Sequence, residues 1–211
     1  MKIPTTASPL AADPAPCAGG PHAHVPAAMI SDYAAGLLPP GLSLLVASHF
    51  TSCPCCRAKA ARFEALGGAL LAEADPVAPA PRCLEAALAR IEAAERAEPC
   101  FDADGWPLPR PLCRRLERPI RELAFAAVAP GLEASRLDGF PGECVTIRRA
   151  AAGAPLRGPG ESGGATGLLL SGTALAAAMT FGPGDCLAGL ADVPRAAETV
   201  PCLCLMVDSA A

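Results

Sequence analysis

The stretch HFTSCPCCR, residues 49–57, decides how the first half of this 211-residue chain folds. It gathers one imidazole and three thiols between His49 and Cys56. Closely spaced His and Cys residues are typical of a zinc site. Because a structural zinc ion takes four ligands in a tetrahedron, the stretch raises two questions: which of the thiols bind, and where the remaining ligand lies.

Two helices are predicted to meet at this stretch. The apolar run from Leu42 to His49 predicts the first of them. For the second helix, Thr51 and Ser52 are favourable caps, Pro54 suits the first position, and the pair Gly67-Gly68 is expected to end it. Cys53 is therefore placed at or beside the start of the second helix.

The spacing H-x3-C-x2-C selects His49, Cys53 and Cys56 as metal ligands. The imidazole hangs from the last turn of one helix, and the two thiolates at the start of the next are favoured by the positive end of its dipole. Cys55 fits less well, because it lies about 100° around the helix axis from Cys56. Its thiol is expected to point elsewhere.

The fourth ligand must come from another segment, and His22 and His24 are the two other histidines of the chain. Both precede the first predicted helix, and spacing alone does not choose between them. An alternative without metal has His49 interacting with helix-end carbonyls and the cysteines packing as small apolar groups. The local spacing favours the metal.

Helices are predicted to fill the front of the chain and strands the back. AHVPAAMISDYAAG (23–36) predicts a first helix, and the amphipathic run CLEAALARIEAAERAE (83–98) a fourth. Strands are expected at ECVTIRRA (143–150), GLLLSG (167–172), ALAAAMTF (174–181) and PCLCLMV (201–207). The predicted fold class is therefore α+β in two domains: a disordered extension (1–20), a four-helix zinc-binding domain (21–98), a linker (99–110), and a β-sandwich or barrel (111–208).

Composition excludes several function classes. The net charge of −4 and the lack of a basic block disfavour direct binding to nucleic acid. Neither an export signal nor a membrane span is expected, so we predict a cytoplasmic protein with no membrane partner. Eleven cysteines, an odd number, make a structural disulfide framework a poor explanation in that compartment. Neither a nucleophile elbow nor a phosphate-binding loop occurs, so no enzyme is expected.

The run YAAGLLPPGLSLLVASHFTSCPCCRAKAARFEALGGALL, residues 33–71, resembles the zinc-binding anti-sigma domain of the ChrR type. In that family a Tyr-Ala-x-Gly-x-Leu-Pro segment leads to a helix that ends in the His of H-x3-C-x2-C. A fourth ligand lies twenty-five residues before that His, which here is His24 and leaves His22 as a bystander. The resemblance implies one structural Zn2+ bound by His24, His49, Cys53 and Cys56.

The same resemblance implies a function. Proteins of this family clamp an extracytoplasmic-function sigma factor in a one-to-one complex and so repress the transcription programme of that sigma factor. Release by an oxidative or related stress signal would be expected. An alternative is a cupin-type ligand or redox sensor whose helical half serves only assembly.

The family continues into a cupin-like domain, whose first metal motif is G-x5-H-x-H-x3-E-x6-G. The interval from Gly153 to Gly172 has the same length, but Pro159 and Glu161 replace the two His, and Ala165 replaces the Glu. A later His of the family would fall at or near Arg195. No metal is therefore expected in the cupin-like domain.

The cysteines and acidic residues of the second half are not expected to form a further site. Cys202 and Cys204 point to one face of a strand, so they could respond jointly to an oxidant, although burial as small packing groups is favoured. The same packing role is expected for the remaining cysteines beyond the zinc motif, Cys83, Cys100, Cys113, Cys144 and Cys186. Glu161, Asp185 and Asp192 show no pairing in sequence, and we expect them to be solvated.

Overall fold

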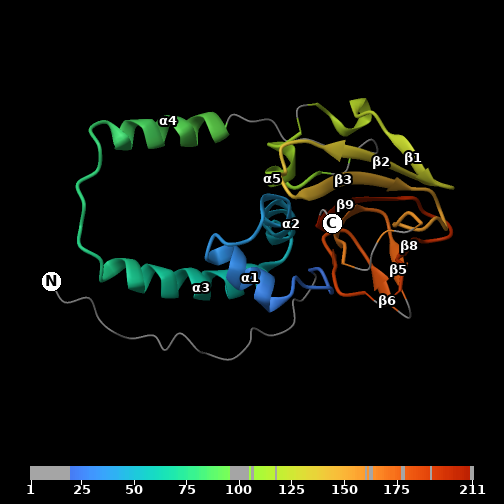
Figure 1. The fold of residues 1–211 in the computed structure, drawn as a ribbon, viewed down its shortest axis with the longest axis horizontal. Coiled ribbons are helices and arrows are strands. Elements are labelled where there is room, and N and C mark those ends of the chain that lie inside the picture. Colours follow the sequence, from blue (N-terminus) through green and yellow to red (C-terminus); the bar gives the residue numbers. More distant parts are fainter. Residues whose placement is uncertain are drawn as a thin grey trace.

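A computed structural model describes residues 20–95, 105, 107–116, 118–159, 161, 164–176, 179–190 and 192–209. Helices come first and two antiparallel sheets follow, which confirms the α+β class (Figure 1). Four helices were predicted for residues 21–98, and this layout is not confirmed as such, because the described chain has a fifth helix, a single turn at residues 110–113. The helices are α1 Ala27–Ala34, α2 Pro40–Phe50, α3 Pro54–Ala72, α4 Cys83–Glu95 and α5 Arg110–Cys113, with a 3-10 turn η1 at Ile120–Glu122.

The start of α3 was predicted more accurately than its end. Cys53 itself is the N-cap, with Pro54 at the first helical position, so the helix begins where the sequence indicates. It does not stop at Gly67-Gly68 but continues to Ala72. Neither glycine adopts the left-handed conformation that ends helices. The residues after them are good helix formers, and a glycine costs only about 1 kcal/mol within a helix.

The second half forms two antiparallel sheets, one with six strands in the order β1-β2-β3-β9-β4-β7 and one with three in the order β6-β5-β8. Strands β3 and β9 pair at the centre of the six-stranded sheet, with Val145 opposite Val207. The predicted run 174–181 is not one strand, since its two ends pair with each other as β5 and β6. The strands are β1 Ala126–Ala129, β2 Leu132–Leu137, β3 Glu143–Ala150, β4 Thr166–Ser171, β5 Ala174–Ala176, β6 Met179–Phe181, β7 Cys186–Leu187, β8 Arg195–Ala196 and β9 Cys202–Ser209.

Strand β9 shows how the six-stranded sheet builds two cores. Leu203, Leu205 and Val207 pack in one cluster with Leu45 of α2. Cys202, Cys204 and Met206 alternate with them and pack between the sheets. The helical and β halves therefore share a continuous apolar core along one face of the sheet.

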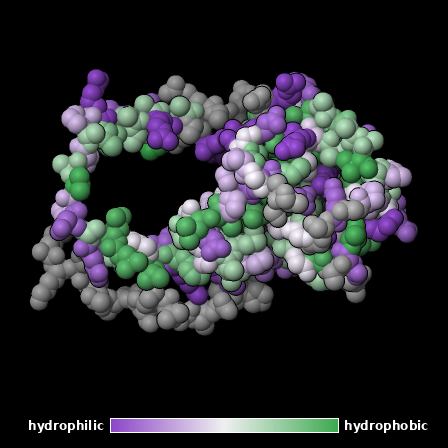
Figure 2. All heavy atoms as spheres, in the orientation of Figure 1, coloured by the Kyte–Doolittle hydropathy of each residue, from purple (hydrophilic) through white to green (hydrophobic). Residues whose placement is uncertain are grey.

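The far part of the helical half makes no such core. Every residue from 63 to 93 is exposed. In Figure 1, α4 stands away from the main body and from α3, and Figure 2 shows that the space between the two helices stays open when side chains are drawn. None of the described helices is long and apolar enough to cross a membrane.

Candidate metal centre

Four side chains meet where α2 ends and α3 begins. The ligand atoms of His24, His49, Cys53 and Cys56 all lie within 4.8 Å of one another. The Nδ1 atom of His24 is 3.3 Å from the Cys53 sulfur and 3.7 Å from the Cys56 sulfur. The structure thus brings together the four residues that the spacing and the family resemblance selected, and it leaves His22 exposed outside the group.

His49 is oriented for metal binding. It is fully buried in the last turn of α2, and its Nδ1–H donates to the Gly184 carbonyl at 2.7 Å. This bond leaves the Nε2 lone pair free, and Nε2 is buried without a hydrogen-bond partner. Burial lowers the pKa of His49, which favours the neutral imidazole that a metal requires.

The two thiols are positioned by the start of α3. The sulfur of Cys53 accepts the backbone N–H of Cys56 at 3.4 Å, as an N-cap side chain does. Burial, followed by a hydrogen bond with Cys53, raises the pKa of Cys56 to about 11. A cation between the two sulfurs would supply the charge that stabilises them as thiolates.

Two of the distances between the ligand atoms suit zinc. With Zn–S near 2.3 Å and Zn–N near 2.0 Å, a tetrahedral ion separates its ligand atoms by about 3.3 to 3.8 Å, and the two His24 distances fall within that interval. A buried, unpartnered imidazole nitrogen beside two buried thiols is a donor set that zinc satisfies. This His2Cys2 group could therefore hold a metal ion.

The other cysteines divide by position. Cys55 is half-buried and disulfide-bonded, as is Cys113, so neither is a simple packing thiol. Cys83 is exposed on α4, contrary to the packing role expected for it, whereas Cys186 is buried. Cys100 lies outside the described residues.

Asp185 is the residue that sequence reasoning most clearly missed. It was expected to be solvated, yet it is 2% exposed, and three backbone N–H groups donate to its carboxylate. Two of these donors, His22 and Ala23, precede the candidate ligand His24. The signal in the sequence was the Gly182 to Asp185 turn, but its partner segment lies some 160 positions away.

The four positions predicted to correspond to cupin ligands do not belong to the cluster of metal-ligating side chains found among the described residues. Glu161 forms a bidentate salt bridge with the buried Arg148, whose two guanidinium N–H groups donate to the Glu161 carboxylate oxygens at 2.6 and 3.1 Å. This pairing contradicts the solvated state expected for Glu161. Burial opposes the ionisation of Glu161, but the hydrogen bond from Arg148 prevails and lowers its pKa. Of the other three positions, Pro159 is exposed in a turn, Ala165 is buried, and the exposed Arg195 donates to a backbone carbonyl.

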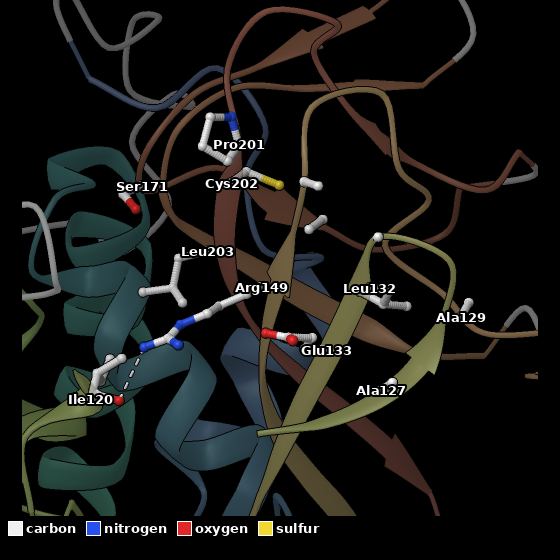
Figure 3. A pocket seen from close by; sticks show the side chains of 13 residues that line it. Ile120, Ala127, Ala129, Leu132, Glu133, Arg149, Ser171, Pro201, Cys202 and Leu203 are labelled. Carbon is white, nitrogen blue, oxygen red and sulfur yellow. Dashed lines mark hydrogen bonds between the residues drawn. The ribbon is translucent and has the colours of Figure 1, made fainter. Parts of the chain in front are cut away.

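Cys202 and Cys204 lie on the same face of β9, as predicted, and both are buried. Burial raises the pKa of Cys202 to about 11 and that of Cys204 further, which disfavours reactive thiolates. Cys202 also lines a pocket of about 510 Å3 (Figure 3). The pocket is mostly apolar, and in it Arg149 donates to the Ile120 carbonyl at 3.3 Å. None of the four residues of the metal group lines it.

A helical unit organised around a His2Cys2 group and packed on an antiparallel β half defines the class of this protein. No family model matches the chain. The anti-sigma-E factor ChrR of Cereibacter sphaeroides is 29% identical over 191 residues, which cover 89% of each chain. This match runs through both halves and confirms the resemblance to ChrR-type anti-sigma factors.

A solved structure gives the same result. The complex of Rhodobacter sphaeroides SigE with the anti-sigma ChrR contains a chain that matches with a TM-score of 0.69 and 27% identity, covering 89% of this chain and 99% of that one. An RmlC-like cupin protein from Ralstonia eutropha matches 43% of this chain and 65% of its own, with 16% identity and a TM-score of 0.34.

Proposed function

We propose that this protein is an anti-sigma factor that sequesters one extracytoplasmic-function sigma factor in a one-to-one complex. It would act in the cytoplasm, repress the transcription programme of that sigma factor, and release it on an oxidative or related stress signal. The similarity to ChrR over 89% of the chain supports the proposal, as does the match to a chain of the SigE–ChrR complex. The function requires no catalysis.

The observation that carries the proposal is a pair of apolar helix faces that are exposed in the described part of the chain. Phe63, Leu66 and Leu70 recur at helical spacing on α3 and are 39 to 64% exposed. Leu84, Leu88 and Ile91 form a similar row on α4 and are 50 to 68% exposed. Exposed apolar rows of this kind mark an interaction site. Two such helices on either side of an open space suit a partner that inserts between them (Figure 2).

Zinc would act as a structural element in this unit. His24 comes before α1, His49 lies in the last turn of α2, and Cys53 and Cys56 lie at the start of α3, so one ion would connect three parts of the helical half. Helix α3 contributes Cys56 and Ala60 as its buried residues, and a closed four-ligand ion would stabilise the attachment of its first turn. We propose residues 21–98 as the zinc-binding anti-sigma domain and residues 111–208 as a cupin-like domain without a metal.

Two measurements test the function. The full chain, mixed with the purified cognate sigma factor, should elute as a one-to-one complex in size-exclusion chromatography with light scattering. It should also suppress sigma-dependent transcription by RNA polymerase in vitro. A zinc-loaded, folded chain that leaves transcription unchanged at micromolar excess would refute the proposal.

The alternative function, a ligand or redox sensor in which the helical half serves assembly, makes different predictions. It requires a ligand or metal in residues 111–208. Elemental analysis that finds one zinc per chain, lost when Cys53 and Cys56 are both replaced by Ser, supports the first function. A second metal that survives the double replacement would favour the sensor.

A further inference from the structure

The β half contacts the metal centre through one tight turn, residues 182–186 between β6 and β7. Asp185 accepts the backbone N–H groups of His22 at 2.6 Å and Ala23 at 2.8 Å through its Oδ1 atom. The backbone N–H of Cys186 donates to the Ala23 carbonyl at 3.0 Å. The segment that carries His24 is thus bound to the turn on both sides of Ala23.

The same turn fixes the other histidine. The Gly184 carbonyl accepts the His49 Nδ1–H at 2.7 Å. The opposite end of α2 is also held by the β half, because the buried carboxylate of Glu143 accepts the N–H groups of Gly41 at 2.6 Å and Leu42 at 3.0 Å. Helix α2 has no capping side chain of its own at that end. Both ends of the helix that presents His49 are therefore attached to the sheet domain.

The thiol ligands have a different support. Cys53 and Cys56 are positioned by the first turn of α3, and their mutual hydrogen bond lies within that turn. The four-ligand group therefore has two halves: a thiol half that is local to one helix, and a histidine half whose orientation depends on residues far away in the sequence.

Asp185 is placed to orient ligands rather than to bind the ion. Its Oδ1 accepts two N–H groups, and its Oδ2 accepts the Gly182 N–H at 2.7 Å, which closes the turn. It does not belong to the four-residue group whose ligand atoms converge. A buried carboxylate of this kind is retained by its hydrogen bonds, and here most of them go to the backbone before His24.

We infer that the turn 182–186, through Asp185 and the Gly184 carbonyl, is the outer support of the metal centre and sets its affinity for zinc. A change in the β half that moves this turn would loosen both histidines while the two thiols keep their geometry. The metal centre would then respond to the state of the β half although that half binds no ion itself. The inference rests on the proposed zinc site but not on the sigma partner.

The first test compares zinc affinity of full-length variants by competition with a chromogenic chelator. Asp185→Ala should weaken zinc binding about 10- to 100-fold, the usual effect of removing an outer support. Asp185→Asn keeps an acceptor for His22 and Ala23 but turns an amide donor toward the Gly182 N–H, so it should weaken binding less. Asp192→Ala, an exposed acidic residue in the same half, should leave affinity unchanged.

A matched pair of glycines separates this effect from lost stability. Gly184 (φ +90°) and Gly189 (φ +65°) both have left-handed backbones, so alanine strains either one. An added Cβ at Gly184 would lie 2.6 Å from the Ser52 Oγ, whereas at Gly189 it meets nothing within 4 Å. Gly184→Ala should weaken zinc binding and alter the visible spectrum of the Co2+-substituted site. Gly189→Ala should change neither.

Two outcomes would overturn the inference. One is wild-type zinc affinity in both Asp185→Ala and Gly184→Ala. The other is an equal loss in Gly189→Ala, which would mean that strain anywhere in the β half acts on the site. Because zinc affinity is measured without the sigma factor, a failure of the proposed anti-sigma function would appear separately, as a zinc-loaded wild-type chain that forms no complex.

Discussion

Replacing the apolar row of α4 should abolish tight partner binding without affecting the free protein. The triple variant Leu84→Ala, Leu88→Ala and Ile91→Ala removes side chains that are 68, 50 and 55% exposed in the free chain. Full burial of a Leu or Ile contributes about 1.5 to 3 kcal/mol. Because about half of each side chain remains to be buried, each replacement should cost about 1 kcal/mol of binding energy. The sum of about 3 kcal/mol corresponds to a roughly 100-fold increase in Kd.

The assay is titration calorimetry of the full chain with its sigma factor, alongside thermal unfolding of the free variant. Tm should stay within a degree or two of wild type, because these side chains are exposed rather than packed in a core. Leu175→Ala, at a 40% exposed leucine of the β half, provides the control and should leave Kd unchanged. A triple variant that binds with wild-type affinity would show that α4 is not part of the interface.

Three further predictions concern stability. Glu161→Gln should lower the free energy of unfolding in urea by about 2 kcal/mol, because the buried Arg148 loses a charged partner. The pKa of Glu161 is lowered on folding, so the difference in stability between wild type and variant should be present at neutral pH and should disappear as the pH falls through the folded-state pKa. Gly172→Ala should lower the free energy of unfolding by about 3 kcal/mol or more, since φ is +81° and the added Cβ would collide with the Pro201 carbonyl oxygen. The control Gly153→Ala has a similar φ of +75° but open space around the added Cβ, so it should lower the free energy of unfolding by only about 1 to 2 kcal/mol. Chelation of zinc should lower Tm reversibly, since an ion at 100 times its Kd stabilises by about 2.7 kcal/mol; an unchanged Tm after complete removal, verified by elemental analysis, would contradict a structural role.

The sequence correctly predicted those features that depend on residues close together in the chain. Pro54 correctly indicated the start of α3, although Cys53 caps the helix in place of the predicted Thr51 or Ser52, and strand β3 coincides with the predicted run 143–150. The predicted end of α3 was wrong. Gly67 and Gly68 keep a helical backbone, because glycine lowers helix stability only modestly and the residues after them favour the helix. The run 174–181 was taken as one strand, because a hairpin between short apolar segments leaves no distinctive periodicity.

The environment of two carboxylates was the second feature that the sequence did not predict. Glu161 and Asp185 were expected to be solvated, but the structure buries Asp185 and half-buries Glu161, both in hydrogen-bonded positions. A carboxylate can be buried only where donors converge on it, and in both cases these donors include residues from other segments of the chain. No pattern around Asp185 indicates that the backbone before His24 will pack against it.

The sequence by itself selected His49, Cys53 and Cys56 as candidate metal ligands, since the spacing H-x3-C-x2-C places them on either side of one helix junction. With the family resemblance it also indicated His24 and the kind of partner. Only the tertiary structure decided what holds the two histidines in place and which helix faces stay open. Both depend on contacts between segments distant in sequence: Asp185 with residues 22 and 23, Glu143 with the start of α2, and the absence of any packing that would bury the described residues 63–93.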